Sequence, residues 1–173
     1  EYHDADGTPV GFLRCAARTT HVAMVSDWLY DELTPAQREE IALAIANKGC
    51  QPLYMALKGM RYPETVTEWQ FVPAALEQFW PIDMRRWPEI LSKNNFRAVI
   101  DGGLALGLFA VRDDPRADDW EEMLADGILR FNDLFKDDGS YDEAVTYVNY
   151  AMKYQILAME VMKRKRGIDY FDT

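Results

Sequence analysis

The stretch SKNNFRAVIDGG, residues 92–103, places two adjacent asparagines directly before an apolar run of small residues that extends to residue 111. A run of this composition predicts a helix that is buried on all sides. Asparagine is a poor residue for a helix interior because its side chain competes for backbone hydrogen bonds. Asn94 and Asn95 therefore either cap this helix or direct hydrogen-bond donors at a ligand, and the sequence leaves both interpretations open.

Two glycines follow inside the same predicted helix, at Gly102 and Gly103. Each costs the helix roughly 1 kcal/mol relative to alanine. That cost is offset where another helix packs closely on the backbone or where a ligand approaches it. Close packing is the more common of the two reasons, and a ligand near the helix is the alternative.

A second unusual stretch, DGSYDEAVTYVNY at residues 138–150, places several tyrosines and an asparagine at the start of another predicted helix. Tyr147, Tyr150 and Tyr154 share one face of that helix. Such a stripe is more often the edge of a core than a site. Tyr147 and Asn149 nevertheless lie in the first two turns, near the positive end of the helix dipole, which favours anions. The two helix entrances together predict one site.

Acidic residues near these entrances allow a different chemistry. Asp142 and Glu143 are most simply first-turn charges that suit the dipole of the predicted helix from about residue 141 to 165. A glycoside hydrolase instead needs two carboxyl groups that face each other across a cleft. Asp101, Asp142 and Glu143 could supply such a pair, although nothing in their spacing selects it.

Helical signals also fill the first third of the chain. An apolar stripe over residues 22–33 predicts an amphipathic helix. Thr34, Pro35 and Gln37 then form a capping-box pattern that begins the next helix. The stripe consists of Val22, Val25, Leu29 and Leu33, with Trp28 adding to it.

The remaining signals complete an all-α prediction. Gly49 and Pro52 predict a bend or break in the second helix, and residues 59–88 predict a long structured connection rich in proline and tryptophan. Residues 117–135 predict a helix, and Gly167 suits the position just after the last one. No convincing alternating strand pattern is present. We predict one helical domain over residues 1–173, built from antiparallel helical hairpins.

Composition restricts the partners. The chain has 173 residues and a formal net charge of −10, with 19 Lys and Arg against 29 Asp and Glu. No basic stripe offsets the acidic balance, which argues against nucleic acid. The longest apolar run, residues 99–111, contains Asp101 and is too short to span a bilayer, so we predict no membrane span.

No cofactor or metal is expected. The two histidines are too few for a histidine-rich metal centre. The sequence contains no Walker or dinucleotide-binding pattern, because the glycines at 102, 103 and 107 lie in a helix-packing run. Cys15 and Cys50 form no metal-binding motif, and their spacing leaves open whether they pair or stay free.

Three strings resemble one family. They are DWLYDELTPAQREEI at residues 27–41, NNFRAVIDGGLALGLFAV at 94–111 and GSYDEAVTYVNYAMKY at 139–154. The chain resembles heparinase II/III-like polysaccharide lyases, in which such strings occur in the same order and spacing. The resemblance covers most of the chain from about residue 21 and implies an incomplete α/α toroid of antiparallel helix pairs. Because the family's full-length members add a large C-terminal β-sandwich region, we expect this chain to be a segment of a longer enzyme.

The resemblance implies β-elimination at a uronic acid of an acidic polysaccharide or oligosaccharide. A donor must neutralise the C5 carboxylate, a base must remove the C5 proton, and an acid must protonate the leaving oxygen. By motif, Asn95 or Asn94 would be the neutraliser and Tyr147 the base and acid. Tyr150 is the alternative if the register is shifted by three residues. The resemblance also implies a periplasmic or secreted location.

Further residues would contact the substrate. By position beside the motifs, these are Asn94, Arg97, Asn149 and Tyr150. An anionic substrate also needs cationic walls. Around the proposed mouth such cations are Arg97, Lys93 and the adjacent pair Arg85 and Arg86.

The sequence departs from the family pattern directly after the asparagines. Many family members place histidine there, where this chain has Phe96. A further family histidine, supplied from beyond the toroid, has no counterpart in these residues. The departure favours a rival hypothesis, in which the chain is a non-catalytic helical module that binds carbohydrate or serves as a scaffold.

Overall fold

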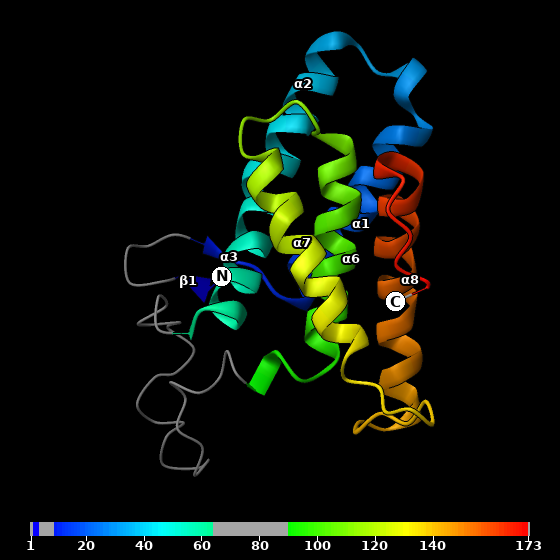
Figure 1. Ribbon diagram of the computed structural model, residues 1–173. Helices are drawn as coiled ribbons and strands as arrows, with labels where there is room; N and C mark the ends of the chain where they lie inside the picture. The colour runs from blue at the N-terminus through cyan, green and yellow to red at the C-terminus, as the bar shows by residue number, and fades with distance from the viewer. Residues whose placement is uncertain (1, 4–8, 64–89, 173) are drawn as a thin grey trace.

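The computed structural model describes residues 2–3, 9–63 and 90–172 (Figure 1). Nearly all of the described chain is helical or turn, so the all-α prediction is confirmed. Most of the connection predicted over residues 59–88 lies outside the described residues, and residues 59–61 are helical. The elements are β1 (Tyr2–His3), β2 (Pro9–Val10), α1 (Leu13–Trp28), η1 (Tyr30–Glu32), α2 (Pro35–Ile45), η2 (Ala46–Cys50), α3 (Gln51–Arg61), α6 (Asn95–Ala110), α7 (Ala117–Asn132) and α8 (Val145–Arg166).

The helices form two layers (Figure 1). Helices α1 and α8 both pack on α6 and run parallel to it, whereas α7 returns in the opposite direction. Helices α3 and α7 pack on each other and on α6, which makes the second layer. Helix α6 lies in one layer with α1 and α8 and also packs against α3 and α7 of the other layer. Its residues 97–108 are therefore all buried, as the apolar run predicts.

Glycines allow the neighbours of α6 to approach its backbone. A Cβ atom on Gly102 would lie 2.7 Å from the Cβ and backbone O of Tyr154 in α8. A Cβ on Gly103 would lie 2.6 Å from the Cα of Ala16 in α1. These distances are far below van der Waals contact, so only glycine fits without a shift. Close helix packing is therefore the reason for the glycine pair.

Helices α2 and α3 are one continuous helical rod, because the predicted bend at Gly49 and Pro52 is a single widened turn, η2. Pro52 has no N–H to donate to the carbonyl of Lys48 one turn earlier. The thiol of Cys15 in α1 donates to that carbonyl instead, at 3.3 Å. Both Cys15 and Cys50 are free thiols.

Local end signals in the sequence are confirmed. Thr34 and Gln37 form the capping box of α2, with Gln37 N donating to Thr34 Oγ1 at 3.3 Å and Thr34 N to Gln37 Oε1 at 2.9 Å. Gly167 follows α8 in the left-handed conformation, with φ of 69°. The helix predicted from residue 117 is α7, whose apolar face is wholly buried and consists of Trp120, Leu124, Ile128 and Phe131.

Two predictions about helices are corrected. The first helix begins at Leu13 rather than near Val22, and its buried face carries the small residues Ala16, Thr19, Thr20 and Ala23. The predicted apolar stripe points outward, with Val22 44%, Val25 46% and Trp28 71% exposed. Small residues replace it at the interface because α1 lies against the glycines of α6 and η2.

The last helix begins at Val145, four residues later than predicted, and its first turn contains no acidic residue. Asp142 and Glu143 are therefore not first-turn charges. Asp142 pairs with Lys136 at 3.0 Å on the surface. Glu143 bonds to a different helix, as described below.

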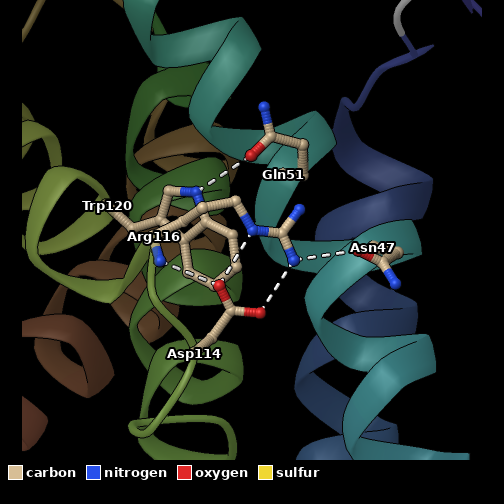
Figure 2. A network of polar contacts seen from close by, with 5 residues as sticks. All are labelled: Asn47, Gln51, Asp114, Arg116 and Trp120. Carbon is tan, nitrogen blue, oxygen red and sulfur yellow. Dashed lines mark hydrogen bonds and ion pairs between the residues drawn. The ribbon is translucent and has the colours of Figure 1, made fainter.

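A polar network fixes the turn between α6 and α7 to the α2–α3 rod (Figure 2). Asp114 accepts from Arg116 Nε at 2.8 Å and from its Nη2 at 2.7 Å, a two-point ion pair. Arg116 Nη2 also donates to Asn47 Oδ1 at 2.8 Å, and the guanidinium lies 4.7 Å from the ring centre of Trp120. Trp120 Nε1 donates to Gln51 Oε1 at 3.2 Å. The α6–α7 turn and the start of α7 are thereby fixed to the rod.

Within the described residues, no helix combines the length and apolar character needed to cross a membrane.

We predict that Gly103→Ala destabilises the fold. The added methyl group meets the backbone of Ala16, so overpacking of about 1–3 kcal/mol outweighs the gain of roughly 1 kcal/mol in helix propensity. Urea unfolding followed by circular dichroism measures the change. Lys153→Ala, an exposed change on α8, should stay within about 0.5 kcal/mol of the wild type. A Gly103→Ala protein as stable as the wild type would contradict the close approach.

Candidate functional site

The first asparagine of the pair caps α6. Asn94 precedes the helix in an extended conformation, and its Oδ1 accepts the N–H of Phe96 at 3.0 Å. This is the standard role of asparagine at a helix start. The capping interpretation is therefore correct for Asn94, whose amide nitrogen is left for other partners.

The next backbone donor of α6 is bound by a residue distant in sequence. The N–H of Asn95 donates to Oε2 of Glu143 at 2.7 Å, and the hydroxyl of Tyr141 donates to the same oxygen at 3.0 Å. A carboxylate suits this position because the helix dipole is positive there. Glu143 thus joins the start of α6 to the segment that leads into α8.

The segment that carries Glu143 is anchored by aromatic packing. The ring of Tyr141 stacks on Phe135 at 5.1 Å between centroids and lies 5.7 Å from Phe131. These rings join a small apolar cluster that includes Ala98 of α6 and Ala151 of α8. Burial and the bond to Glu143 raise the pKa of Tyr141, so its hydroxyl stays a donor.

The side chain of Asn95 remains uncommitted. Asn95 is 4% exposed, and its backbone N–H is taken by Glu143. In the described part of the chain its carboxamide makes no hydrogen bond, yet its atoms are not sealed from solvent. The carboxamide of Asn95 therefore lies almost wholly buried at the start of α6.

The tyrosines of α8 divide between surface and core. Tyr147 is 54% exposed, and Asn149 is also exposed. Tyr150 and Tyr154 are partly buried and pack edge to face at 5.4 Å. Burial and the hydrogen bond to Tyr150 raise the pKa of Tyr154 to about 12. Tyr147 is thus the tyrosine of the stripe that solvent reaches most readily.

Both entrances lie at the same end of the molecule. Helices α6 and α8 begin at the lower end of Figure 1 and run upward side by side. Tyr147 is four positions after Glu143, so their Cα atoms are at most about 14 Å apart. Because Glu143 is bonded to Asn95, the predicted site residues Asn95 and Tyr147 come from neighbouring elements. Whether their side chains meet in one cleft stays a prediction.

Arg97 and Phe96 are packed inward. Arg97 is 3% exposed, and its Nε donates to the carbonyl of Ser92 at 3.0 Å. Phe96 is half-buried and lies 6.3 Å from Phe12, edge to face. Arg97 supports the turn before α6, so a role in substrate binding requires a ligand to reach a buried guanidinium. Arg85 and Arg86 lie outside the described residues.

Asp101 is sealed between α6 and α7. It is fully buried, and neither carboxyl oxygen has a hydrogen-bond partner. A Cβ on Gly127 would lie 2.2 Å from its Oδ1, so the glycine makes room for the carboxyl group. Burial raises the pKa of Asp101 to about 8, and the positive charge of Arg97 opposes that shift. A sealed carboxyl cannot reach a sugar, which weighs against a glycoside hydrolase that uses Asp101.

A pocket of about 350 Å³ lies at the opposite end, where α6 and α8 finish. Two of its three cations already have partners, since Arg166 bonds to Glu121 at 2.5 Å and Lys165 lies 4.0 Å from the ring centre of Phe109, while the third, Arg112, is exposed. Helix C-termini also disfavour anions. The pocket is therefore a poor place for an acidic sugar, despite its size.

Sequence reasoning missed Tyr141, and it named Glu143 only as a first-turn charge or as one carboxyl of a hydrolase pair. The bond from Asn95 to Glu143 spans 48 residues, and no local pattern encodes such a contact. The sequence signal for Glu143 was its position shortly before the helix that carries Tyr147. Comparison with known proteins adds no family: no family model and no curated protein matches this chain.

We predict that Asp101→Asn stabilises the protein more at neutral than at acidic pH. The pKa of about 8 in the folded state exceeds the unfolded value of about 3.9. The folded state therefore keeps a proton that the unfolded state releases, so stability falls as pH rises from about 4 to about 8. Asparagine does not titrate and escapes this loss.

Urea unfolding at about pH 4.5 and about pH 7.5 measures the effect. Asp118→Asn, an exposed change at the start of α7, is the matched control and should show the same difference from wild type at both pH values. An equal effect of Asp101→Asn at the two pH values would show that the carboxyl is not held neutral.

Proposed function

We propose that this chain is the helical part of a heparinase II/III-like polysaccharide lyase that cleaves an acidic polysaccharide by β-elimination at uronic acid residues. The observation that carries the proposal is the bond from Asn95 N to Glu143 Oε2 at 2.7 Å. This bond ties the paired asparagines to the segment that leads into α8, whose first turn carries Tyr147. Amide donors and an exposed phenol at adjoining helix entrances are the groups that such a reaction needs.

Each group has a step. The carboxamide of Asn95, with the amide nitrogen of Asn94, would donate to the C5 carboxylate and withdraw charge from it. The C5 proton becomes more acidic, and the deprotonated phenolic oxygen of Tyr147 removes it. The pair of electrons forms the C4–C5 double bond and expels the glycosidic oxygen, which takes a proton from Tyr147. The positive ends of α6 and α8 favour the developing negative charge.

The arrangement of helices supports the architectural part of the proposal. Helices α1, α6 and α8 run parallel in one layer, and α3 and α7 form the other. Because α7 runs antiparallel to α6, helices pair antiparallel between the two layers, which suits a segment of an incomplete α/α toroid. We infer a segment of a longer chain in the periplasm or outside the cell, where polysaccharide substrates occur.

A non-catalytic carbohydrate-binding or scaffolding module is the second candidate. Phe96 packs against Phe12, in the place where many family members carry histidine, and it has no acid–base chemistry. Arg97 is buried, which removes one cation from the expected wall. These two observations favour binding without turnover. Oligosaccharide binding by calorimetry without any unsaturated product would support this candidate over the lyase.

The direct test is incubation with alginate, heparin-like and related acidic polysaccharides. A lyase creates a C4–C5 double bond that absorbs in the ultraviolet, whereas a hydrolase creates none. The full-length native polypeptide that contains this chain is the proper sample. Absence of the absorbance across all these substrates would end the lyase proposal.

We predict that Tyr147→Phe lowers turnover by about 10²–10⁴, because general acid–base catalysis is lost. Stability should hardly change, since the ring remains and the side chain is 54% exposed. Tyr154→Phe is the matched control, two turns deeper on the same face. It removes a hydroxyl bonded to Tyr150, which costs about 1 kcal/mol of stability while turnover stays near the wild-type value. Unchanged turnover in Tyr147→Phe would exclude this residue as the base.

A further inference from the structure

We propose that Glu143 is a positioning residue whose carboxylate sets the geometry between the asparagine entrance of α6 and Tyr147. The inference rests on the proposed lyase function and assigns a role that the family resemblance does not give. It is carried by two hydrogen bonds to one carboxylate oxygen, from Asn95 N at 2.7 Å and from Tyr141 Oη at 3.0 Å.

The bond to Asn95 orients one half of the site. With its N–H held by Glu143, the first residue of α6 cannot turn about the helix start. Asn94 is fixed at the same time, because its own side chain caps Phe96 N. The Nε of Arg97 donates to the carbonyl of Ser92, which fixes the turn before α6. The carboxamide of Asn94 and the backbone at Asn95 are thus fixed, and a preorganised donor costs no reorganisation during reaction.

The bond to Tyr141 orients the other half. Tyr141 is packed between Phe131 and Phe135, so it fixes the loop that precedes α8. Helix α8 has Ala144 at its cap position, with no side-chain capping bond. Glu143, the residue before this cap, is therefore the nearest polar anchor for the turn that carries Tyr147.

A direct proton-transfer role for Glu143 fits less well. Its Oε2 already accepts two donors, and Glu143 is only partly exposed. Asp101, a candidate second carboxyl, is sealed in the α6–α7 interface. Glu143 has no described carboxyl partner across a cleft, so its chemistry is that of an anchor.

Two substitutions separate an anchor from a proton-transfer group. Glu143→Gln keeps an oxygen that accepts both hydrogen bonds, whereas Glu143→Ala removes it. On the full-length polypeptide we expect Glu143→Ala to lower kcat by about 10–100-fold, because small misplacement of reacting groups is costly. KM should change by less than about threefold. Glu143→Gln should stay within about threefold of wild-type kcat with an unchanged pH profile.

The neighbouring Asp142→Ala is the matched control, because Asp142 is an exposed carboxylate that pairs only with surface Lys136 in the described structure. It should leave kcat unchanged. If Glu143→Ala does not fold, Tyr141→Phe replaces it, since this change removes one of the two bonds but keeps the ring packing. Kinetics are measured where circular dichroism shows every variant to be folded, so a loss of stability alone does not lower kcat.

Amide hydrogen exchange by NMR on this chain tests the anchor without any substrate. In Glu143→Ala the Asn95 and Tyr147 amides should exchange at least about tenfold faster than in Asp142→Ala. If the wild type forms no unsaturated product, the lyase proposal fails, and exchange alone decides whether Glu143 is the anchor. Unchanged exchange, wild-type kcat in Glu143→Ala, or equal loss of kcat in Glu143→Gln and Glu143→Ala would each overturn the positioning role.

Discussion

Close approach of two helices to the backbone of α6 is the constraint on which the arrangement depends. A methyl group on Gly102 would collide with Tyr154, and one on Gly103 would collide with Ala16. Helices α1 and α8 can therefore lie nearer to α6 than side chains would permit. Dense packing of this kind is sensitive to single methyl groups. It holds α8 at a fixed height along α6, which brings the two helix starts to one end of the molecule.

The same constraint explains which parts of the fold the sequence could predict. Some features depend on residues only three or four positions apart, so a single segment of sequence predicts them. They are the capping box at Thr34, the glycine at Gly167 and the buried face of α7. The buried face of α1 cannot be predicted from its own sequence in this way. Its most apolar residues, such as Trp28, point outward, because α6 and η2 admit only small residues. Tertiary fit there overrides the preference to bury the larger apolar side chain.

The candidate site was predictable only in outline. The two helix entrances were visible as unusual sequence, but their union depends on a hydrogen bond between residues 95 and 143. A helix start attracts a carboxylate from any segment that reaches it. The preference for acidic residues in a first turn therefore suggested that Glu143 belongs to α8. In the fold the nearer positive end is that of α6, and Glu143 binds there.

The buried polar groups show where the fold accepts a cost. Asp101 faces Gly127 without a hydrogen bond, and Arg97, one turn before it, holds a carbonyl of the preceding turn. Burying a charged carboxylate is expensive, and holding it as the neutral acid reduces that cost. A raised pKa is frequent in active sites, but the geometry assigns this one to packing. Asp101, the carboxyl group with the raised pKa, is sealed from any substrate, whereas the candidate base Tyr147 is 54% exposed.

The two interpretations of the asparagine pair apply to different members. Asn94 is the cap, since its side-chain oxygen binds Phe96 N. The N–H of Asn95 donates to Glu143, so the carboxamide of Asn95 does not cap the helix. A capping residue alone would explain one asparagine but not its neighbour, because leucine or alanine would fit a buried first-turn position at lower cost. A second, buried amide that makes no described hydrogen bond at the start of α6 is what favours a ligand.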